Sequence, residues 1–483
     1  MTTKDSQLSG PYATLSHKWG NIRQLRLKNH TLSAFQAGIR LEKLPKTFRE
    51  AVQLTQRLKI RYLWIDSLCI IQDSKADWET ESLRMEAVYS NCCINIAATI
   101  SENSRGGRFQ DRDVMNCRPL FGRITLGTES FLLYDQNLLE FAIEVTPLNS
   151  RAWVLQERIL SPRVLHFAES QVLWECHTLD ASEFFPRGLP TSYNLGVNLV
   201  GKSLDQERFT ERGRELGREQ MEAPYPYNLW YAVVTRYSKC EITNAADYLV
   251  AIGGLARRIY LVSKDKYLAG LWKSRLSEGL LWSTHFPAEC HRSQPNRAPS
   301  WSWASIEGSV YWLRRTDGQD LLEGNVKSAE VVPLTAADPF GQIKRGAIQL
   351  ADVEVLTPHK LKFDRGEEKD QRCTVEPPDG YIRGRRIVQG SIRILMDFLL
   401  PEVFLVSKDI IILPVLADGG VEDVETAVIF GLILHQVTST SDTDTFERVG
   451  MVWYVTGSGG TDDEEIPRTE LEYPRKTLSI TII

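Results

Sequence analysis

Two carboxyl groups in the segment 62–98 stand at positions where acids commonly do chemistry. Asp66 directly follows the apolar run YLWI at residues 62–65, and Glu81 lies on an amphipathic stretch further along. A short apolar run rich in aromatic and β-branched residues predicts a strand covered on both faces. Ligands of open α/β sheets bind beyond the carboxyl ends of the strands, which is where Asp66 falls. Asp66 and Glu81 are therefore the candidate catalytic residues.

Residues 75–89 have helical spacing, and Glu81 falls on the apolar side of that helix. At about 100° per residue, Met85, Val88 and Tyr89 share this side with it. A carboxylate placed there must be paired, hydrogen-bonded or protonated. Two interpretations stay open: an ion pair with Arg84 or another arginine, and a working acid, since perturbed acids gather at functional sites.

A second predicted strand, at residues 12–15, also ends in polar side chains. Ser16 and His17 follow it directly, and Trp19 comes two residues later. Parallel strands bring their carboxyl ends to the same edge of a sheet, so this loop is expected to face the same crevice as Asp66. His17 is a candidate ligand contact. The structural alternative is a packed turn in which the histidine only fills space.

The order of elements predicts an α/β fold for the N-terminal part. An amphipathic helix starts at Pro45 and runs to about residue 58, between the two strands above, and a third strand is expected at residues 93–98. Strand, helix, strand, helix, strand demands parallel pairing with right-handed crossovers.

The length of 483 residues predicts two or three domains. We expect an α/β domain at residues 10–178, a mainly helical region at 179–297 and a β-rich domain at 298–483. Within these, residues 139–145 are expected to form a strand and residues 266–281 a helix.

Charge and cysteine content exclude several classes of function. The net charge of −5 and the lack of a long Lys/Arg cluster argue against nucleic-acid binding. Eight scattered cysteines have no zinc-ligand spacing, so no metal is expected, and they fit a reducing cytoplasm. No stretch is apolar enough to predict a membrane span.

Three motifs in this order resemble the HET (heterokaryon incompatibility) domain of filamentous fungi. They are YATLSHKWG at residues 12–20, WIDSLCIIQDSKADWETESLRMEAVYSN at 64–91 and SRAWVLQERILSPRVLHF at 150–167. The stretch APSWSWASIEGSVYW at 298–312 is similar to a tryptophan-rich segment that often follows HET domains. Its Trp301 and Trp303 would stack on a sugar or base, or serve as core anchors.

The resemblance implies a TIR-like, flavodoxin-like parallel sheet and, from TIR enzymes, cleavage of the nicotinamide–ribose bond of NAD. NAD would then be a substrate, with no cofactor required. Glu81 would be the acid, Asp66 or Asp73 would position the ribose or water, and Tyr12, His17 and Trp19 would contact nicotinamide. The remaining candidates are ligand contacts at Ser16, Cys69 and Arg84, and motif positions at Trp64, Gln72, Trp78, Arg151, Trp153, Gln156 and Glu157. Glu157 pairs with a nearby arginine or acts in catalysis.

The family also implies a role in non-self recognition and programmed cell death, with a protein partner in incompatibility signalling. Two alternatives stay open: a non-enzymatic module that signals by self-association, and an accessory protein of a metabolic gene cluster. HET proteins commonly carry more chain before the first motif than the eleven residues present here. If that part supplies a strand, the sheet edge next to Tyr12 is exposed.

Overall fold

The computed structural model divides the chain into two compact units, which are described separately. Unit 1 comprises residues 1–218, 240–243 and 250–255, and unit 2 comprises residues 219–239, 244–249 and 256–483. The structure describes residues 9–107, 122–126, 129–133, 139–189, 226–312, 319–355, 361–364, 372–375, 381–382, 385–387, 393–398, 410–418, 426–439, 444–457 and 476–483.

Unit 1 alternates strands and helices in its first hundred residues. Its strands are β1 (Tyr12–Ser16), β2 (Tyr62–Trp64), β3 (Ile94–Ala97), β4 (Gly122–Leu126), β5 (Glu129–Leu133), β6 (Arg163–Phe167), β7 (Val172–Cys176) and β8 (Asp180–Ser182). Its helices are α1 (Leu32–Ala37), α2 (Lys46–Arg57), α3 (Asp66–Cys69), α4 (Lys75–Ser90) and α5 (Ala152–Leu160), with short helical turns η1 (Asn29–Thr31), η2 (Leu41–Lys43) and η3 (Glu140–Glu144). The predicted strand and helix alternation over residues 12–98 is confirmed.

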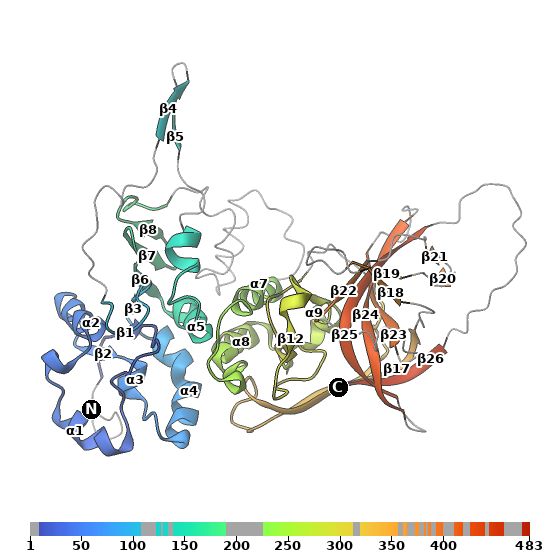
Figure 1. Ribbon diagram of the computed structural model, residues 1–483, viewed down its shortest axis with the longest axis horizontal. Coiled ribbons are helices and arrows are strands. Elements are labelled where there is room, and N and C mark those ends of the chain that lie inside the picture. The colour runs from blue at the N-terminus through green and yellow to red at the C-terminus, as the bar shows by residue number, and fades with distance from the viewer. Residues whose placement is uncertain are drawn as a thin grey trace, which may run out of the picture. The chain divides into compact units, whose positions relative to one another are not determined.

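Six strands of unit 1 form one mixed sheet in the order β2-β1-β3-β6-β7-β8 (Figure 1). β1 pairs in parallel with β2 and with β3, and β3 pairs in parallel with β6. β7 and β8 continue the sheet as antiparallel strands. The strand at Tyr12 is thus paired on both sides and β2 forms the edge, so the expectation of an open edge next to Tyr12 is wrong.

The two faces of this sheet have different characters because side chains alternate along a strand. Ala13 and Leu15 pack against Phe48 and Ala51 of α2 in an apolar core. On the opposite face, Val154 of α5 packs in a smaller apolar cluster, whose other members are Ala97, Leu148 and Val164. The α5 face also carries polar side chains, which are described below.

Residues 140–144 form the helical turn η3, so the strand predicted at residues 139–145 is wrong. Leu139 and Ile143 are both buried, whereas Phe141 and Val145 are exposed. Residues four apart lie on the same side of a helix, so a helical turn buries both of these side chains. The alternation of apolar and charged residues, which is typical of a strand, does not decide the structure here.

Unit 2 contains helices followed by many strands. Its helices are α7 (Tyr227–Tyr237), α8 (Val250–Ser263, whose first residues belong to unit 1) and α9 (Leu276–Gly279). Its strands are β9 (Tyr267–Leu268), β10 (Leu271–Trp272), β11 (Trp282–Thr284), β12 (His291–Arg292), β13 (Ile306–Glu307), β14 (Val310–Trp312), β15 (Gln319–Asp320), β16 (Val326–Pro333), β17 (Ile343–Val355), β18 (Leu361–Asp364), β19 (Arg372–Val375), β20 (Tyr381–Ile382), β21 (Arg385–Ile387), β22 (Arg393–Met396), β23 (Ile410–Asp418), β24 (Thr426–Ser439), β25 (Asp444–Gly457) and β26 (Lys476–Ile482).

The strands β15 to β26 gather in one large, mainly antiparallel sheet, so the C-terminal region is β-rich as predicted (Figure 1). The helix predicted at residues 266–281 is wrong: it is replaced by the β9/β10 hairpin and the short helix α9. Ala269 and Gly270 both have positive φ, of 50° and 96°, as a two-residue hairpin turn requires. Two consecutive residues in that region cannot continue a right-handed helix.

Large aromatic side chains fill the core of unit 2. Trp301 and Trp303 are both 0% exposed, and Trp303 donates a hydrogen bond to the carbonyl of Gly270 at 3.0 Å. These two rings are core anchors, which settles the alternative in which they stack on a sugar or base. The fully buried Arg448 donates to Asp397, likewise fully buried, at 2.8 and 2.9 Å, and its guanidinium lies over the Trp282 ring.

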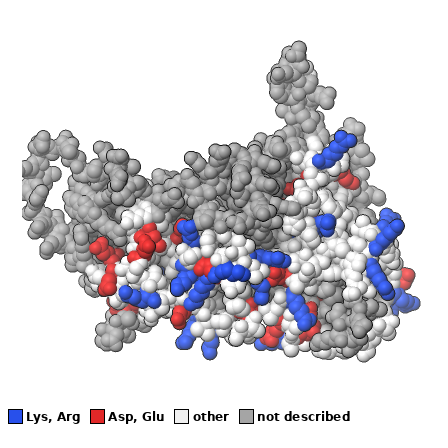
Figure 2. Space-filling view, turned by 180° about the vertical axis from the view of Figure 1, so that it is seen from behind, with Lys and Arg blue, Asp and Glu red and all other residues white. Residues whose placement is uncertain are grey.

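Basic and acidic side chains lie next to one another on the described surface seen in Figure 2, as the near balance of charges in the sequence leads one to expect. Among the described residues, no helix has both the length and the apolar character that crossing a bilayer takes.

Candidate functional site

A row of polar side chains crosses β1 and β3 on the face that α5 covers. Thr14 is in register with Asn95, and Ser16 follows two residues later on the same face. Thr14 Oγ1 donates to Asn95 Oδ1 at 3.1 Å, and Asn95 Nδ2 donates to Ser16 Oγ at 3.0 Å. All three side chains are buried. The order β2-β1-β3 makes the boundary between β1 and β3 a point of chain reversal, where open α/β sheets bind their ligands.

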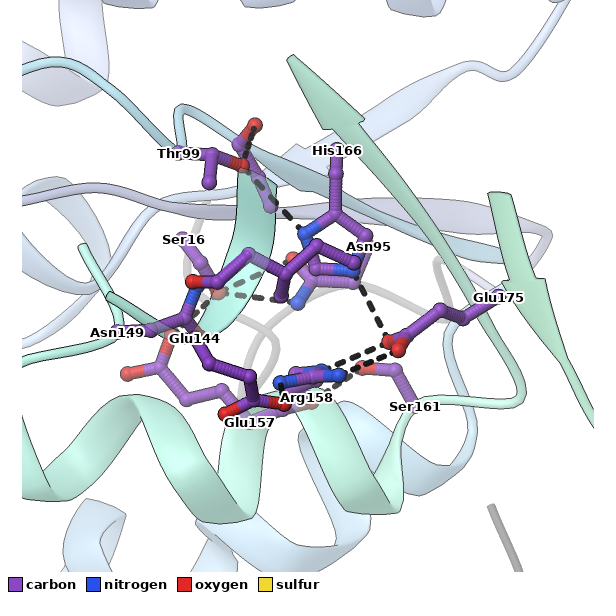
Figure 3. A network of polar contacts seen from close by, with 12 residues as sticks. Ser16, Asn95, Thr99, Glu144, Asn149, Glu157, Arg158, Ser161, His166 and Glu175 are labelled. Carbon is purple, nitrogen blue, oxygen red and sulfur yellow. Dashed lines mark hydrogen bonds and ion pairs between the residues drawn. The ribbon is translucent and has the colours of Figure 1, made fainter. Parts of the chain in front are cut away.

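Glu157 of α5 points into this row, as Figure 3 shows. Eight of the nine residues of this helix, AWVLQERIL, are buried, including its polar residues Gln156, Glu157 and Arg158, and Glu157 is 3% exposed. The hydroxyl groups of Ser16 and Tyr89 donate to its carboxyl group. Ser16, Tyr89, Asn95 and Glu157 are called the Glu157 group below.

Burial raises the pKa of Glu157 to about 7 from its ordinary 4.5. Arg151 and the two hydroxyl donors oppose this rise in the pKa, and the negative charge of Asp66 adds to it. A carboxyl group with such a pKa exchanges its proton readily at neutral pH, which is what a general acid or base requires.

A second set of polar side chains surrounds Asp66 at the carboxyl end of β2. Trp19 Nε1 donates to Asp66 Oδ2 at 2.9 Å, and the backbone N–H of Ser67 donates to Asp66 Oδ1 at 2.6 Å. The Nδ1 of His17 lies 3.8 Å from Asp66 Oδ1, and Gln24 Nε2 lies 2.6 Å from His17 Nε2. We call His17, Trp19, Gln24, Asp66 and Ser67 the Asp66 group.

His17 in the Asp66 group is a neutral imidazole at physiological pH. Burial lowers the pKa of His17 to about 4, although the neighbouring Asp66 carboxylate works in the opposite direction. It packs edge-on against Phe48, with 4.8 Å between ring centroids. His17 is therefore placed to hold a hydrogen bond rather than to donate a proton to a substrate.

Arg151 connects the two groups. It donates to the backbone carbonyl of His17, and its charge acts on the pKa of Glu157. Its guanidinium carbon lies 6.0 Å from the centre of the Trp19 ring, and that of Arg26 lies 4.8 Å from the same ring. Trp19, Arg26 and Arg151 are all partly exposed. Two guanidinium groups beside a partly exposed indole suit a ligand that carries both phosphate and an aromatic ring.

A separate buried ion cluster lies next to the Glu157 group on the same helix (Figure 3). Arg158 donates to Glu175 at 2.8 and 2.5 Å and to Glu144 at 2.7 Å, and His166 Nε2 lies 3.0 Å from Glu175. Burial alone would raise the pKa of Glu175, but Arg158 and His166 hold it well below its ordinary range. This cluster ties α5, η3, β6 and β7 together.

Glu81 of α4 pairs with an arginine of its own helix. Its side chain is 21% exposed and accepts a hydrogen bond from Arg84 at 2.8 Å, so the ion pair considered from the sequence is present. The buried residues of α4 are Met85 and Tyr89. The carboxyl group that the structure brings to the strand ends beside Asp66 is that of Glu157.

The other sequence candidates divide between the site and its support. Ser16, His17, Trp19, Asp66 and Glu157 come together in the two groups, and Arg151 connects them. Trp64 packs on Tyr89 with 5.5 Å between ring centroids, and the amide of Gln72 donates to the backbone carbonyls of Asp66 and Ile70. The remaining candidates belong to neither group. Tyr12 donates a hydrogen bond to the carbonyl of Val88, and Asp73 accepts one from Asn29. Cys69 is an exposed residue of α3, and Gln156 is buried on α5. Trp78 and Trp153 are partly exposed.

Four members of the two groups were not among the sequence candidates for the site: Gln24, Ser67, Tyr89 and Asn95. Asn95 had a visible signal, since it is a polar residue inside the apolar run INIA, where a buried strand needs a partner for any amide. The spacing of Tyr89 indicated only that it belongs to the apolar face of a helix. Gln24 lies in a segment without periodic pattern, so no local signal identified it.

Comparison with known proteins gives one match. Residues 12–157 match the family model described as heterokaryon incompatibility protein (HET). Searches of curated proteins and of solved structures found no match. All members of the Glu157 and Asp66 groups lie inside the matched residues, whereas His166 and Glu175 lie beyond them. Residues 12–157 of this chain are therefore a domain of the heterokaryon incompatibility (HET) family.

Proposed function

We propose that this chain acts in fungal non-self recognition and cell death by hydrolysing the nicotinamide–ribose bond of NAD, with Glu157 as the working carboxyl group. The observation that carries the proposal is the buried Glu157 carboxyl, with a pKa raised to about 7, at the carboxyl ends of β1 and β3. Glu157 takes the role that the sequence suggested for Glu81, because Glu81 is partly exposed and pairs with Arg84, whereas Glu157 is buried against Ser16 at the end of β1.

The chemistry needs a carboxylate in a dry, ordered place. When the bond between ribose C1′ and the nicotinamide nitrogen breaks, its electron pair leaves with nicotinamide, which becomes neutral, and positive charge develops on the ribose. An ionised Glu157 offsets that charge and can hold the ribose hydroxyls. Water then adds to C1′ and its proton passes to Glu157 or to solvent, so no oxidant, reductant or cofactor takes part.

The partly exposed residues supply binding. Arg26 and Arg151 carry the charges that suit the pyrophosphate of a dinucleotide, since guanidinium groups form paired hydrogen bonds with phosphate oxygens. The Trp19 indole offers an aromatic surface beside them. The strand order β2-β1-β3 supports the TIR-like interpretation of the domain, because TIR and flavodoxin-like sheets begin in that order. The described cysteines are free thiols, which fits the reducing cytoplasm expected for such an enzyme.

The test is release of nicotinamide from NAD by the purified full-length chain, followed from about pH 5.5 to 8.5, a range that brackets the pKa of Glu157. We expect kcat/KM to rise with pH and to level off above about pH 7, because the carboxylate is the form that stabilises the ribose cation. Protein should be assayed both dilute and concentrated. Absence of nicotinamide release in every condition would contradict the proposal and favour a module that signals by self-association.

A further inference from the structure

Two buried polar atoms of the Asp66 group have no hydrogen-bond partner among the described residues. They are Oε1 of Gln24 and Oγ of Ser67. Gln24 is 7% exposed and Ser67 is 0% exposed. Buried polar groups in folded proteins are nearly always hydrogen-bonded, so these two atoms of one small group are candidate contacts for a bound polar molecule.

The backbone holds these two side chains in neighbouring segments. The N–H of Leu27 donates to the carbonyl of Ser67 at 2.8 Å, and the N–H of Gln72 donates to the carbonyl of Leu27 at 2.9 Å. The segment that carries Gln24 therefore lies against α3, at whose start Ser67 stands. Ser67 is fixed further by its N–H donation to Asp66 Oδ1.

The hydrogen bond between Gln24 and His17 determines which atom of the amide is left over. His17 is neutral at physiological pH, and the 2.6 Å contact joins Gln24 Nε2 to His17 Nε2. In the tautomer of His17 whose proton is on Nδ1, the amide nitrogen of Gln24 donates to Nε2 of the imidazole, which leaves Gln24 Oε1 as an acceptor without a donor. Ser67 Oγ adds a hydroxyl that can donate or accept.

We infer that Gln24 Oε1 and Ser67 Oγ bind the carboxamide of the substrate, so that this pair selects nicotinamide over nicotinic acid. An acceptor and a hydroxyl complement the N–H and C=O of a primary carboxamide. A carboxylate has no N–H to offer and would set negative charge against the Gln24 carbonyl oxygen. This inference rests on the proposed function, because it assigns the specificity of the same site.

The experiment measures nicotinamide binding directly, by ligand-detected NMR up to about 10 mM on the full-length chain. Ser67→Ala and Gln24→Met are each expected to weaken binding by about tenfold, the size of effect that one hydrogen bond to a ligand gives. Ser67→Ala removes a hydroxyl that bonds nothing in the protein, so its thermal stability should not fall. Ser82→Ala is the matched control, because its hydroxyl bonds within α4 and should leave binding unchanged.

A second measurement separates this inference from the proposed function. Wild type should cleave NAD at least about tenfold faster than its nicotinic acid analogue, and Gln24→Met should lose that preference. Cleavage of NAD with no preference, or with a preference that both variants keep, would overturn the carboxamide assignment and leave the hydrolysis intact. Nicotinamide binding that falls in Ser67→Ala without any NAD cleavage would uphold the assignment and contradict the hydrolysis. Equal nicotinamide binding by wild type and both variants would mean that the two atoms contact only water, and this result would overturn the carboxamide assignment.

Discussion

Glu157→Gln is expected to make the N-terminal domain more stable at pH 8, by on the order of 2–3 kcal/mol, while abolishing activity. The pKa of Glu157 is about 7 in the folded chain against an ordinary 4.5. Between these two pH values the folded state keeps a proton that the unfolded state has released, so stability falls as pH rises. Glutamine carries no charge and escapes this loss. At pH 4 both states of wild type hold the proton, and the gain should vanish.

Hydrogen exchange at the backbone amides of β1 and β3, followed as a function of denaturant concentration, measures the free energy of unfolding of the domain. Nicotinamide release measures the activity. Loss of a positioned carboxylate should lower kcat by about 10²–10⁴-fold. Glu81→Gln is the matched control, since that carboxyl is partly exposed and paired with Arg84, and both stability and activity should stay close to wild type. A Glu157→Gln variant that is less stable at pH 8 would identify Glu157 as a structural latch.

Arg158→Met is expected to destabilise the N-terminal domain strongly, by on the order of 3–5 kcal/mol at pH 7. The guanidinium contacts both Glu144 and Glu175, and the side chains of all three are at most 10% exposed. Methionine fills similar space without supplying charge, so two buried carboxylates lose their shared cation. The difference in unfolding free energy between the variant and wild type should shrink as pH falls toward 4, for two reasons. In the folded variant the two buried carboxyl groups take up protons and lose their unpaired charge. In wild type the low pKa of Glu175 stabilises the folded state above the ordinary pKa of a glutamate, and this contribution declines as pH falls below it.

Urea unfolding at pH 7 and pH 4 measures this effect. The control is Arg163→Met, which removes an exposed arginine at the start of β6 and should cost less than about 1 kcal/mol. An Arg158→Met variant as stable as Arg163→Met, or a deficit that does not depend on pH, would contradict the view that Arg158 neutralises the two glutamates.

The sequence predicts which side chains follow the strands of the candidate site better than which carboxyl group is buried beside them. Two apolar runs that end in Ser16, His17 and Asp66, separated by helical patterns, are enough to place these side chains at one edge of a parallel sheet. The pairing rule for parallel strands does this without any knowledge of packing. The role of Arg151 and Glu157 came only from motif resemblance, because their contacts at the end of β1, His17 and Ser16, are 134 and 141 residues away in the chain.

The choice between Glu81 and Glu157 shows what a helical wheel leaves out. A wheel gives the angle at which Glu81 leaves its helix, but a glutamate is long enough to reach Arg84 one turn on, at the margin of the buried face. On α5 nearly every position is buried, so a carboxyl group there cannot reach the margin of the buried face. A charged residue on a helix that is buried on nearly every side is the stronger signal for a perturbed acid.

The errors in the fold have similar local causes. The hairpin at residues 267–272 depends on Ala269 and Gly270 adopting positive φ, and Gly270 carries a carbonyl that both Trp230 and Trp303 bond. These contacts join residues far apart in sequence, so a local pattern of apolar spacing could not reveal them. Likewise, the register that sets Thr14 opposite Asn95 follows from strand pairing and not from either strand alone.

The state of Glu157 is measured most directly by a carboxyl ¹³C NMR titration of the full-length chain, with Glu157→Gln to assign the resonance that disappears. The account predicts that this resonance titrates at about pH 7 and that saturating NAD moves its midpoint lower, because the cationic nicotinamide ring favours the carboxylate. A midpoint near the ordinary 4.5, unmoved by NAD, would contradict the assignment of Glu157 as the working acid.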